Sequence, residues 1–338
     1  MKRRSPRVGS PPEHEPIGRD AMDLPLEKKL TIGFSATMPT PAAAREVSAL
    51  ADRLGYESLW TGDHIAFAVP MLDPLLQLAQ VAAVNPRLIL GTGVYLMPLR
   101  HATTVAKLVA TFDHLCEGRF IFGVGVGGEF PNEYAACGVP VKERGARLTD
   151  GIKTIRKLWT GEKVSNEESR FYPFTDVQML PRPVTPGGPP IWAGGRSKAA
   201  LERCGRLTNG WISYVVTPEM YRDGLEKIAV AAADAKRDLK TFGSGHLVFM
   251  RIDDTYERAL DLAAAHLTRR YAMDFRPAAK RYAVLGTPAD CAQRIADFHA
   301  AGVRHFVLDC TGPLEERDAQ LERFAKEVRP LLGQLKAA

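Results

Sequence analysis

The chain has 338 residues, of which 45% are hydrophobic and 25% charged, the balance of an ordinary globular protein with room for one large α/β domain. Its formal net charge of +6 is spread out, without a Lys/Arg-rich helix or an aromatic-interleaved basic strip, so we do not expect a nucleic-acid partner. No apolar run approaches the roughly 18 residues of a membrane span, so we expect no membrane segment.

The start of the chain and its cysteines indicate the domain boundary and the cellular compartment. Residues 1–28 are rich in proline and charge and lack periodicity, which predicts a mobile tail ahead of a single domain over 29–338. The basic start is followed by Pro, Gly and acidic residues, which argues against a signal peptide. Five scattered cysteines without a C-x-x-C pair predict reduced thiols and a cytoplasmic location.

From residue 30 onward, short β-rich runs alternate with helical patterns. The eight strand candidates are 30–35, 58–64, 87–96, the run that starts at 119, 190–195, 210–216, 244–252 and 303–310. Their continuous apolar character is typical of parallel strands covered on both faces. Eight strand–helix units at this length predict an α/β fold, a closed (β/α)8 barrel of the TIM type.

Two segments do not fit the simple unit and predict insertions after strand 4 and around strands 7 and 8. Residues 162–189 are rich in Pro, Gly and polar residues, which suggests a hairpin or a long excursion, and residues 272–288 separate the seventh helix from the last unit. Long excursions often form an active-site rim, and the alternative is a flap with a packing role.

A glycine-spaced run, "RFIFGVGVGGEF", follows the fourth strand candidate, and Gly123, Gly125 and Gly128 satisfy the spacing G-x-G-x-x-G. A dinucleotide fold needs a helix to begin at once behind these glycines, whereas Pro131 and Pro140 interrupt the chain here. We therefore interpret the glycines as the end of a barrel strand, where a ligand approaches the backbone.

Several motifs in order carry a family resemblance: "LGTGVYLMPLRH", "FDHLCEGRFIFGVGVGGEFPNEYAACGVPVKERGARL", "LWTGEKV", "PPIWAGG" and "NGWISY". Together they resemble the bacterial luciferase-like flavin oxidoreductases, and most of all the branch that uses the deazaflavin coenzyme F420. The likeness covers residues from about 30 to about 215. It departs from motifs frequent in that family at Arg100–Ala102, Cys116–Arg119 and Asn209–Trp211. The resemblance implies a barrel, commonly a homodimer, that holds FMN or F420 at the carboxyl ends of its strands.

Asp63 and His64 end the second strand candidate, on the face where barrel enzymes keep their chemistry. An imidazole titrates near neutrality and can pass a proton to a substrate, and the resemblance places a histidine such as His64 beside the flavin ring. The alternative is a histidine that only caps the next turn. Asp63 either holds the imidazole in one tautomer or caps the following helix.

Small residues at 91–94 leave room for a planar ring against the backbone, so Thr92, Gly93 and Val94 are candidate coenzyme contacts. The resemblance implies a cis peptide at Gly93–Val94, and the alternative is an ordinary strand. Gly125 is a further candidate at the end of the fourth strand.

The sequence "AGGRSKAALERC" places Gly194 and Gly195 at a strand end, followed by Arg196 and by Ser197 at a helix start. Free N–H groups at such a helix start bind phosphate, which both coenzymes carry, although Gly-Gly-X-Ser is also an ordinary turn with a cap.

The remaining candidates are less specific. The deazaflavin branch suggests that one of Glu129, Asn132 and Glu133 contacts the ring or the substrate, and the alternative is a set of solvated rim residues. Arg100 and His101 meet either the coenzyme or a nearby carboxylate. Arg144 and Arg147 are more typical of structural ion pairs, and Trp192 and Trp211 of the core.

We therefore expect an oxidoreductase or monooxygenase that uses reduced FMN, supplied by a separate flavin reductase, or F420 on a small organic substrate. Two alternatives from other classes are a flavin-binding barrel without turnover and a metal-dependent hydrolase. The hydrolase needs a His-x-His after the first strand, where "GFSATMP" has no histidine, so we expect no metal site.

Overall fold

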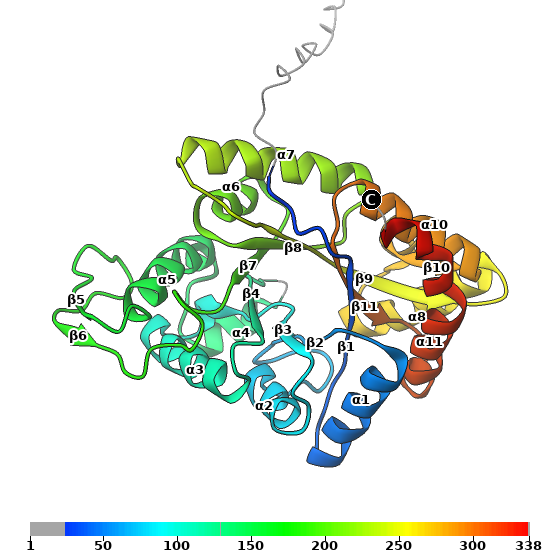
Figure 1. Ribbon diagram of the computed structural model, residues 1–338, viewed down its shortest axis with the longest axis horizontal. Helices are drawn as coiled ribbons and strands as arrows, with labels where there is room; N and C mark the ends of the chain where they lie inside the picture. The colour runs from blue at the N-terminus through cyan, green and yellow to red at the C-terminus, as the bar shows by residue number, and fades with distance from the viewer. Residues whose placement is uncertain (1–23, 129, 337–338) are drawn as a thin grey trace, which may run out of the picture.

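The computed structural model describes residues 24–128 and 130–336 (Figure 1). Its strands are β1 (Thr31–Ser35), β2 (Ser58–Thr61), β3 (Ile89–Thr92), β4 (Phe120–Val124), β5 (Lys163–Val164), β6 (Val177–Gln178), β7 (Ile191–Gly194), β8 (Gly210–Tyr214), β9 (Gly243–Ile252), β10 (Val284–Gly286) and β11 (His305–Cys310). Its α-helices are α1 (Pro41–Leu54), α2 (Pro74–Val84), α3 (Ala102–Leu115), α4 (Pro131–Ala136), α5 (Arg144–Leu158), α6 (Lys198–Leu207), α7 (Pro218–Asp234), α8 (Tyr256–Tyr271), α9 (Arg276–Tyr282), α10 (Pro288–Ala300) and α11 (Arg317–Arg323).

Eight parallel strands close into a barrel. In the order β1, β2, β3, β4, β7, β8, β9 and β11 each strand pairs with the next, and β11 pairs again with β1, where His305 faces Thr31. Helices surround the barrel on its outside (Figure 1). The eight strand candidates coincide with these eight strands, so the predicted (β/α)8 architecture is confirmed.

Strand β9 is long and extends past the barrel. Its residues 243–247 pair with β8, whereas Met250 faces both Cys310 of β11 and Val284 of β10. Strand β10 therefore pairs with the part of β9 that lies beyond the end of β8. The sequence analysis placed an irregular insertion over 272–288 and missed this strand, because only three residues of it are extended.

The amino-terminal half of the barrel is filled by two indole rings. Trp60 and Trp192 are buried, and His305 packs edge-on against both, with ring centroids 5.3 and 5.4 Å apart. A Cβ atom on Gly91 would lie 2.4 Å from the Trp60 ring, so only glycine allows this approach. The bottom of the barrel is thus a packed core, and Trp192 and Trp211 are core residues as predicted.

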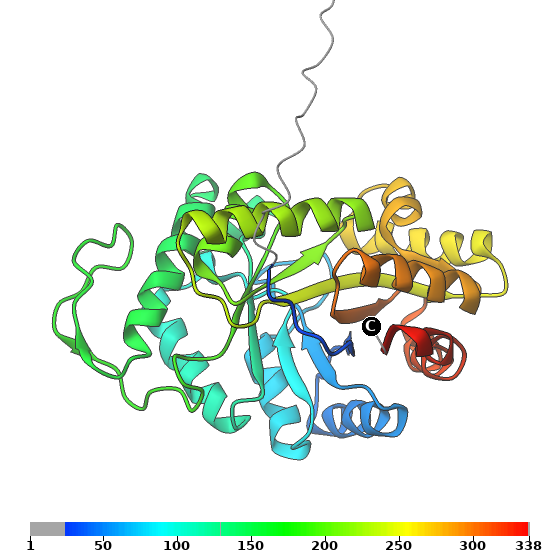
Figure 2. The same ribbon diagram turned by 45° about the horizontal axis from the view of Figure 1, so that its top comes forward.

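Residues 162–189 form the predicted excursion, with an antiparallel β5–β6 hairpin. The segment packs on the outside of the barrel, where Asp113 of α3 accepts hydrogen bonds from the backbone N–H (2.7 Å) and hydroxyl (3.0 Å) of Thr185. Both views show the hairpin projecting outward beside α5 (Figures 1 and 2). Helix α5 runs back toward the amino ends of the strands, so the connection that follows it begins at the end of the barrel opposite to the usual active site.

The described chain begins inside the segment that the sequence analysis assigns to a tail. Leu26 forms a β-bridge with Phe242, and the Phe242 N–H donates to the carbonyl of Pro25 at 2.8 Å. Residues 25 and 26 therefore already pack on the barrel, whereas residues 1–23 lie outside the described residues. All five cysteines are free, and no helix in the described part is long and apolar enough to cross a membrane.

Candidate functional site

A cavity of about 220 Å³ lies at the carboxyl ends of the barrel strands. Every barrel strand contributes to it: Ser35, Gly62, Gly93, Gly125, Gly194, Tyr214, Leu247 and Asp309 line it. All of these lie at or next to the ends of their strands except Leu247, which lies within the longer β9 and pairs with Tyr214 at the end of β8. Its rim consists of the loops after β2 and β4 and the last turn of α8, and no described residue of 162–189 or 272–288 reaches it. Of the two alternatives for these segments, an active-site rim and a flap with a packing role, the cavity lining therefore favours the second.

Backbone rather than side chains forms much of the cavity wall. Gly62, Gly93, Gly125, Gly194 and Gly195 all line it. A Cβ atom on Gly125 would lie 2.3 Å from Cγ2 of Val94, and one on Gly194 would lie 3.2 Å from Cγ1 of Val94. The Gly93–Val94 peptide is cis, at the position that the family resemblance implies. A flat ligand can thus lie against this wall, which added side chains would fill.

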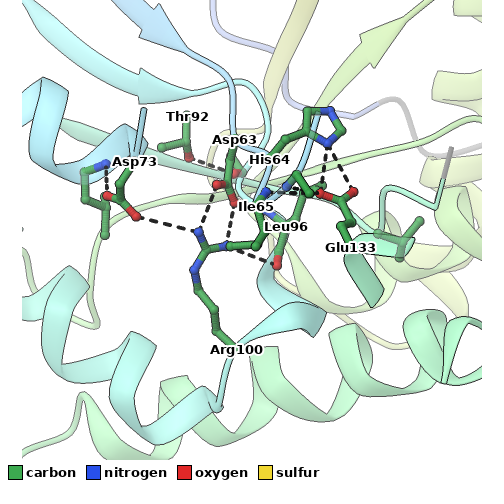
Figure 3. Close-up of polar contacts among 12 residues, drawn as sticks. Asp63, His64, Ile65, Asp73, Thr92, Leu96, Arg100 and Glu133 are labelled. Atoms are coloured by element: carbon green, nitrogen blue, oxygen red, sulfur yellow. Dashed lines mark hydrogen bonds and ion pairs between the residues drawn. The ribbon is translucent and has the colours of Figure 1, made fainter. Parts of the chain in front are cut away.

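His64 lines the cavity and is held by Glu133 of α4. Its Nδ1 lies 3.1 and 3.2 Å from the two carboxylate oxygens of Glu133, and Oε2 also accepts the N–H of Ile65 at 3.1 Å (Figure 3). An ionised carboxylate only accepts hydrogen bonds, so Nδ1 carries a proton and Nε2 is left for a ligand. Glu133 is fully buried, which excludes a solvated rim position for it.

Asp63 is buried beside His64 but contacts different residues. Its carboxylate accepts two hydrogen bonds from the Arg100 guanidinium, at 2.6 and 2.9 Å, and one from the N–H of Leu96 at 2.8 Å (Figure 3). Burial by itself lowers the pKa of Arg100, but Asp63 outweighs burial and raises that pKa. Asp63 therefore neither orients the His64 ring nor caps a helix, and Arg100 meets a carboxylate, one of its two expected partners.

On another part of the wall, Arg270 of α8 pairs with Asp309 of β11. Nη1 of Arg270 donates to Oδ2 of Asp309 at 2.8 Å, and the two side chains are 25% and 11% exposed. Tyr214 and Tyr271 lie beside this pair in the cavity lining. None of these four residues is a candidate from the sequence. For Arg270 and Tyr271 the reason is that the pattern of α8 does not show that its last turn reaches the strand ends.

The start of α6 lies at the edge of the cavity. Gly194 and Gly195 line the cavity, and the chain continues through Arg196 to Ser197, the N-cap, whose Oγ accepts the N–H of Ala200 at 3.3 Å. Arg196 and Ser197 are exposed, and Nη1 of Arg196 donates to the carbonyl of Val215. The geometry therefore brings together the four residues of the predicted phosphate site beside the cavity.

Other candidates lie away from the cavity. Thr92 is fully buried and its hydroxyl donates to the Gly123 carbonyl at 2.7 Å, so the structure does not bring it to a ligand. Asn132 is exposed on α4 and does not line the cavity. His101 is the N-cap of α3, and Arg147 forms the expected ion pair, with Glu143 at 2.9 Å. Glu129 lies outside the described residues.

Comparison with known proteins places the chain in a family. Residues 26–305 match the family described as luciferase-like monooxygenase. The chain belongs to this family. It is an oxidoreductase of the luciferase-like type, and the cavity at its strand ends is where such a barrel carries its chemistry. No group of three or more His, Cys, Asp and Glu side chains that could hold a metal occurs among the described residues.

Three similar proteins illustrate the range of this family. An F420-dependent glucose-6-phosphate dehydrogenase of Amycolatopsis mediterranei is 28% identical, over 90% of this chain and 99% of its own length. A phthiodiolone/phenolphthiodiolone dimycocerosates ketoreductase of Mycobacterium bovis is 31% identical, over 68% of this chain and 67% of its own. The structure of an F420-dependent secondary alcohol dehydrogenase with an F420–acetone adduct shares the fold, with a TM-score of 0.78 at 18% identity over 90% of this chain and 99% of that one.

Proposed function

We propose that the cavity binds coenzyme F420 and that the protein transfers hydride between it and a small alcohol or ketone. The supporting observation is the wall of Gly62, Gly93, Gly125, Gly194 and Gly195, which exposes backbone at the four neighbouring strand ends of β2, β3, β4 and β7. A planar tricyclic ring fits such a wall, whereas Cβ atoms on Gly125 or Gly194 would fill it. When bound, the deazaflavin supplies two-electron hydride chemistry without oxygen activation.

The start of α6 suits the phosphate of the coenzyme. The first N–H groups of a helix have no partner within the helix, and the helix dipole favours an anion there. Arg196 adds a positive charge at the same place, and Ser197 fixes where α6 begins. We therefore assign Gly195, Arg196 and Ser197 to phosphate binding, with Gly93, Val94 and Gly125 against the ring.

His64 is the proposed proton-transfer group. The N–H at Nδ1 donates a hydrogen bond to Glu133 and keeps its proton, so Nε2 is the basic nitrogen and can take the proton of a substrate hydroxyl. In the reverse direction the same nitrogen returns a proton to a ketone oxygen. Glu133 is a positioning residue in this scheme, since it holds the ring and its tautomer without touching the substrate.

The choice of F420 over FMN is supported by the similar dehydrogenases, which are F420-dependent and align with nearly the whole chain. Titration of the purified full chain with oxidised and reduced F420 and FMN, followed by fluorescence, tests it. We expect F420 to bind at least tenfold more tightly than FMN. Preference for reduced FMN would instead indicate an oxygenase served by a separate flavin reductase. Binding of neither coenzyme would overturn the proposal, and F420 binding without turnover of any alcohol would indicate a silent coenzyme-binding barrel.

We further propose a homodimer that works in the cytoplasm. Leu76 of α2 and Leu108 and Leu115 of α3 are 72%, 47% and 56% exposed, and α2 and α3 lie next to each other (Figure 1), so we assign these leucines to the contact with a second copy. The free cysteines suit a reducing compartment. Light scattering on the eluted protein measures the oligomeric state, and Leu108→Lys should shift it toward the monomer.

A further inference from the structure

The Arg270–Asp309 pair offers both a donor and an acceptor to the cavity while carrying no net charge. Nη1 of Arg270 contacts Asp309, and a guanidinium has five N–H donors, so further donors remain beside the cavity that Arg270 lines. Burial lowers the pKa of Arg270, but Asp309 outweighs it and raises that pKa, so the arginine stays charged. The pair is a fixed dipole that suits a neutral polar group.

The other charged residues of the described cavity lining are already compensated. Asp63 is paired with Arg100, and His64 faces the carboxylate of Glu133. Among the described lining residues, Arg270 is thus the only lysine or arginine, and Asp309 compensates its charge. A phosphate dianion in this space would therefore lie among carboxylates without a free positive charge, which is costly in a partly buried site.

Most of the remaining side chains in the cavity lining are apolar, and Ser35, Ser213 and Tyr214 add hydroxyl groups. Phe67, Met71, Leu96, Phe130 and Leu247 line the cavity together with Tyr271. Phe67 stacks on the His64 ring with centroids 4.1 Å apart and packs edge-on against Phe130 at 4.8 Å. A substrate that reaches His64 is therefore flanked by aromatic rings, which favours hydrocarbon over sugar hydroxyls.

We propose that the substrate is an uncharged, largely apolar alcohol or ketone whose second hydroxyl or carbonyl group binds to Arg270 and Asp309, and that organic phosphates are excluded. This inference rests on the proposed function, since it takes the redox oxygen to lie at His64. It separates this chain from its similar relatives named as glucose-6-phosphate dehydrogenases, whose substrate carries a phosphate.

Matched probes test the proposal by calorimetric titration of the F420-loaded protein. Cyclohexanol, cyclohexane-1,4-diol and 4-hydroxycyclohexanecarboxylate share a ring and differ only in the remote group, and glucose 6-phosphate represents phosphate esters. We expect the diol to bind about tenfold more tightly than cyclohexanol, with the carboxylate and the phosphate ester weakest. Tighter binding of the carboxylate or of glucose 6-phosphate would overturn the proposal, as would equal binding of diol and cyclohexanol or binding of none of the probes.

Variants of the pair provide the second arm. Asp309→Asn leaves the charge of Arg270 uncompensated, so the carboxylate should gain at least tenfold in affinity relative to the diol. The double variant Arg270→Met/Asp309→Leu should bind the diol no better than cyclohexanol. As a control, Asp261→Asn breaks an exposed ion pair with Arg276 and should change neither ratio. The proposal would be overturned if the carboxylate-to-diol affinity ratio in Asp309→Asn and the diol-to-cyclohexanol ratio in the double variant both equalled those of the wild type. If the wild-type chain does not bind F420 at all, the proposed function itself is refuted.

Discussion

The Glu133 carboxylate holds Nδ1 of His64 at 3.1 and 3.2 Å from a position that is fully buried. The same carboxylate accepts the N–H groups of Ile65 and Ala66, at 3.1 and 3.4 Å, so it fixes both the imidazole and the loop that carries it. Helix α4 thus determines which nitrogen of His64 faces a ligand, and Glu133 is required for the proton transfer that we assign to His64.

Substitution of His64 or of Glu133 should slow turnover more than it weakens coenzyme binding. General acid–base groups contribute about 10²- to 10⁴-fold, so we expect His64→Ala to lower kcat by about 10²-fold or more. Glu133→Gln should lower kcat at least about tenfold with a smaller change in KM, and Glu133→Asp should recover part of the loss. Steady-state kinetics with F420 and an alcohol measure these effects, and full activity of His64→Ala would remove this residue from the mechanism.

A carboxylate at the start of α6 should prevent coenzyme binding. Ser197→Asp places a negative charge against the phosphate that we assign to this helix start, so binding of F420 or FMN should be lost in a fluorescence titration. Thr255→Asp is a matched control, because Thr255 is likewise an exposed N-cap, at the start of α8, and does not line the cavity. Unchanged affinity in Ser197→Asp would place the phosphate elsewhere.

Any side chain at position 125 should collide with Val94 and disturb the cavity. A Cβ atom on Gly125 would lie 2.3 Å from Val94 Cγ2, so Gly125→Ala displaces Val94 into the cavity and should weaken coenzyme binding at least tenfold. Removing both methyl groups in Val94→Ala creates room, so the double variant Gly125→Ala/Val94→Ala should recover part of the affinity. Equal affinities of the single variant and the wild type would show that the ring lies away from this wall.

The barrel was predictable because each barrel strand is a continuous apolar run bounded by glycine, proline or polar residues, as in "RFIFGV" before Gly125. Strand β10 was not predictable, since the three residues Val284–Gly286 are too few to show a hydrophobic pattern. The composition and length of residues 162–189 leave a choice between an active-site rim and a packing flap, whereas a connection that follows a helix emerges at the amino end of the strands. Chain direction, rather than composition, decides which loops reach the cavity.

The residues that line the cavity were predictable only where they lie next to the end of a strand. Gly93 and Val94 come just after β3, Gly125 follows β4, and Gly194 ends β7. The family resemblance implies the cis peptide at Gly93–Val94. The partners of His64 and Asp63 were not predictable, because Glu133 is 69 residues away from His64 and Arg100 is 37 residues away from Asp63. Such pairings depend on how loops from different strands meet.

Removal of Arg100 should destabilise the fold. Asp63 is 1% exposed and its main partner is the Arg100 guanidinium, so Arg100→Met leaves a buried carboxylate without its cation. Breaking a buried ion pair in this way costs about 3–5 kcal/mol in the free energy of unfolding, measured by urea denaturation. Arg276→Met removes a cation from an exposed pair and should cost about 0–1 kcal/mol. Similar losses in the two variants would contradict the structural role assigned to Arg100.

Two buried histidines should make the protein acid-sensitive. His246 and His305 are almost completely buried, and burial lowers the pKa of each to about 3. In the unfolded chain a histidine titrates near pH 6.5, so between pH 3 and 6.5 the unfolded state binds protons that the folded state refuses. The free energy of unfolding therefore falls as the pH is lowered through this window, and it is not affected by these two groups above it.

Each of these histidines should cost about 2 kcal/mol in the free energy of unfolding between pH 7 and pH 5. Urea denaturation at the two pH values gives this difference within one variant, so a general loss of stability cancels. His246→Gln and His305→Gln should each reduce the pH 7 to pH 5 difference by about 2 kcal/mol relative to wild type. His114→Gln, at an exposed position on α3, should leave the difference unchanged. If both variants show the same difference in the free energy of unfolding between pH 7 and pH 5 as the wild type, groups other than His246 and His305 cause the acid sensitivity.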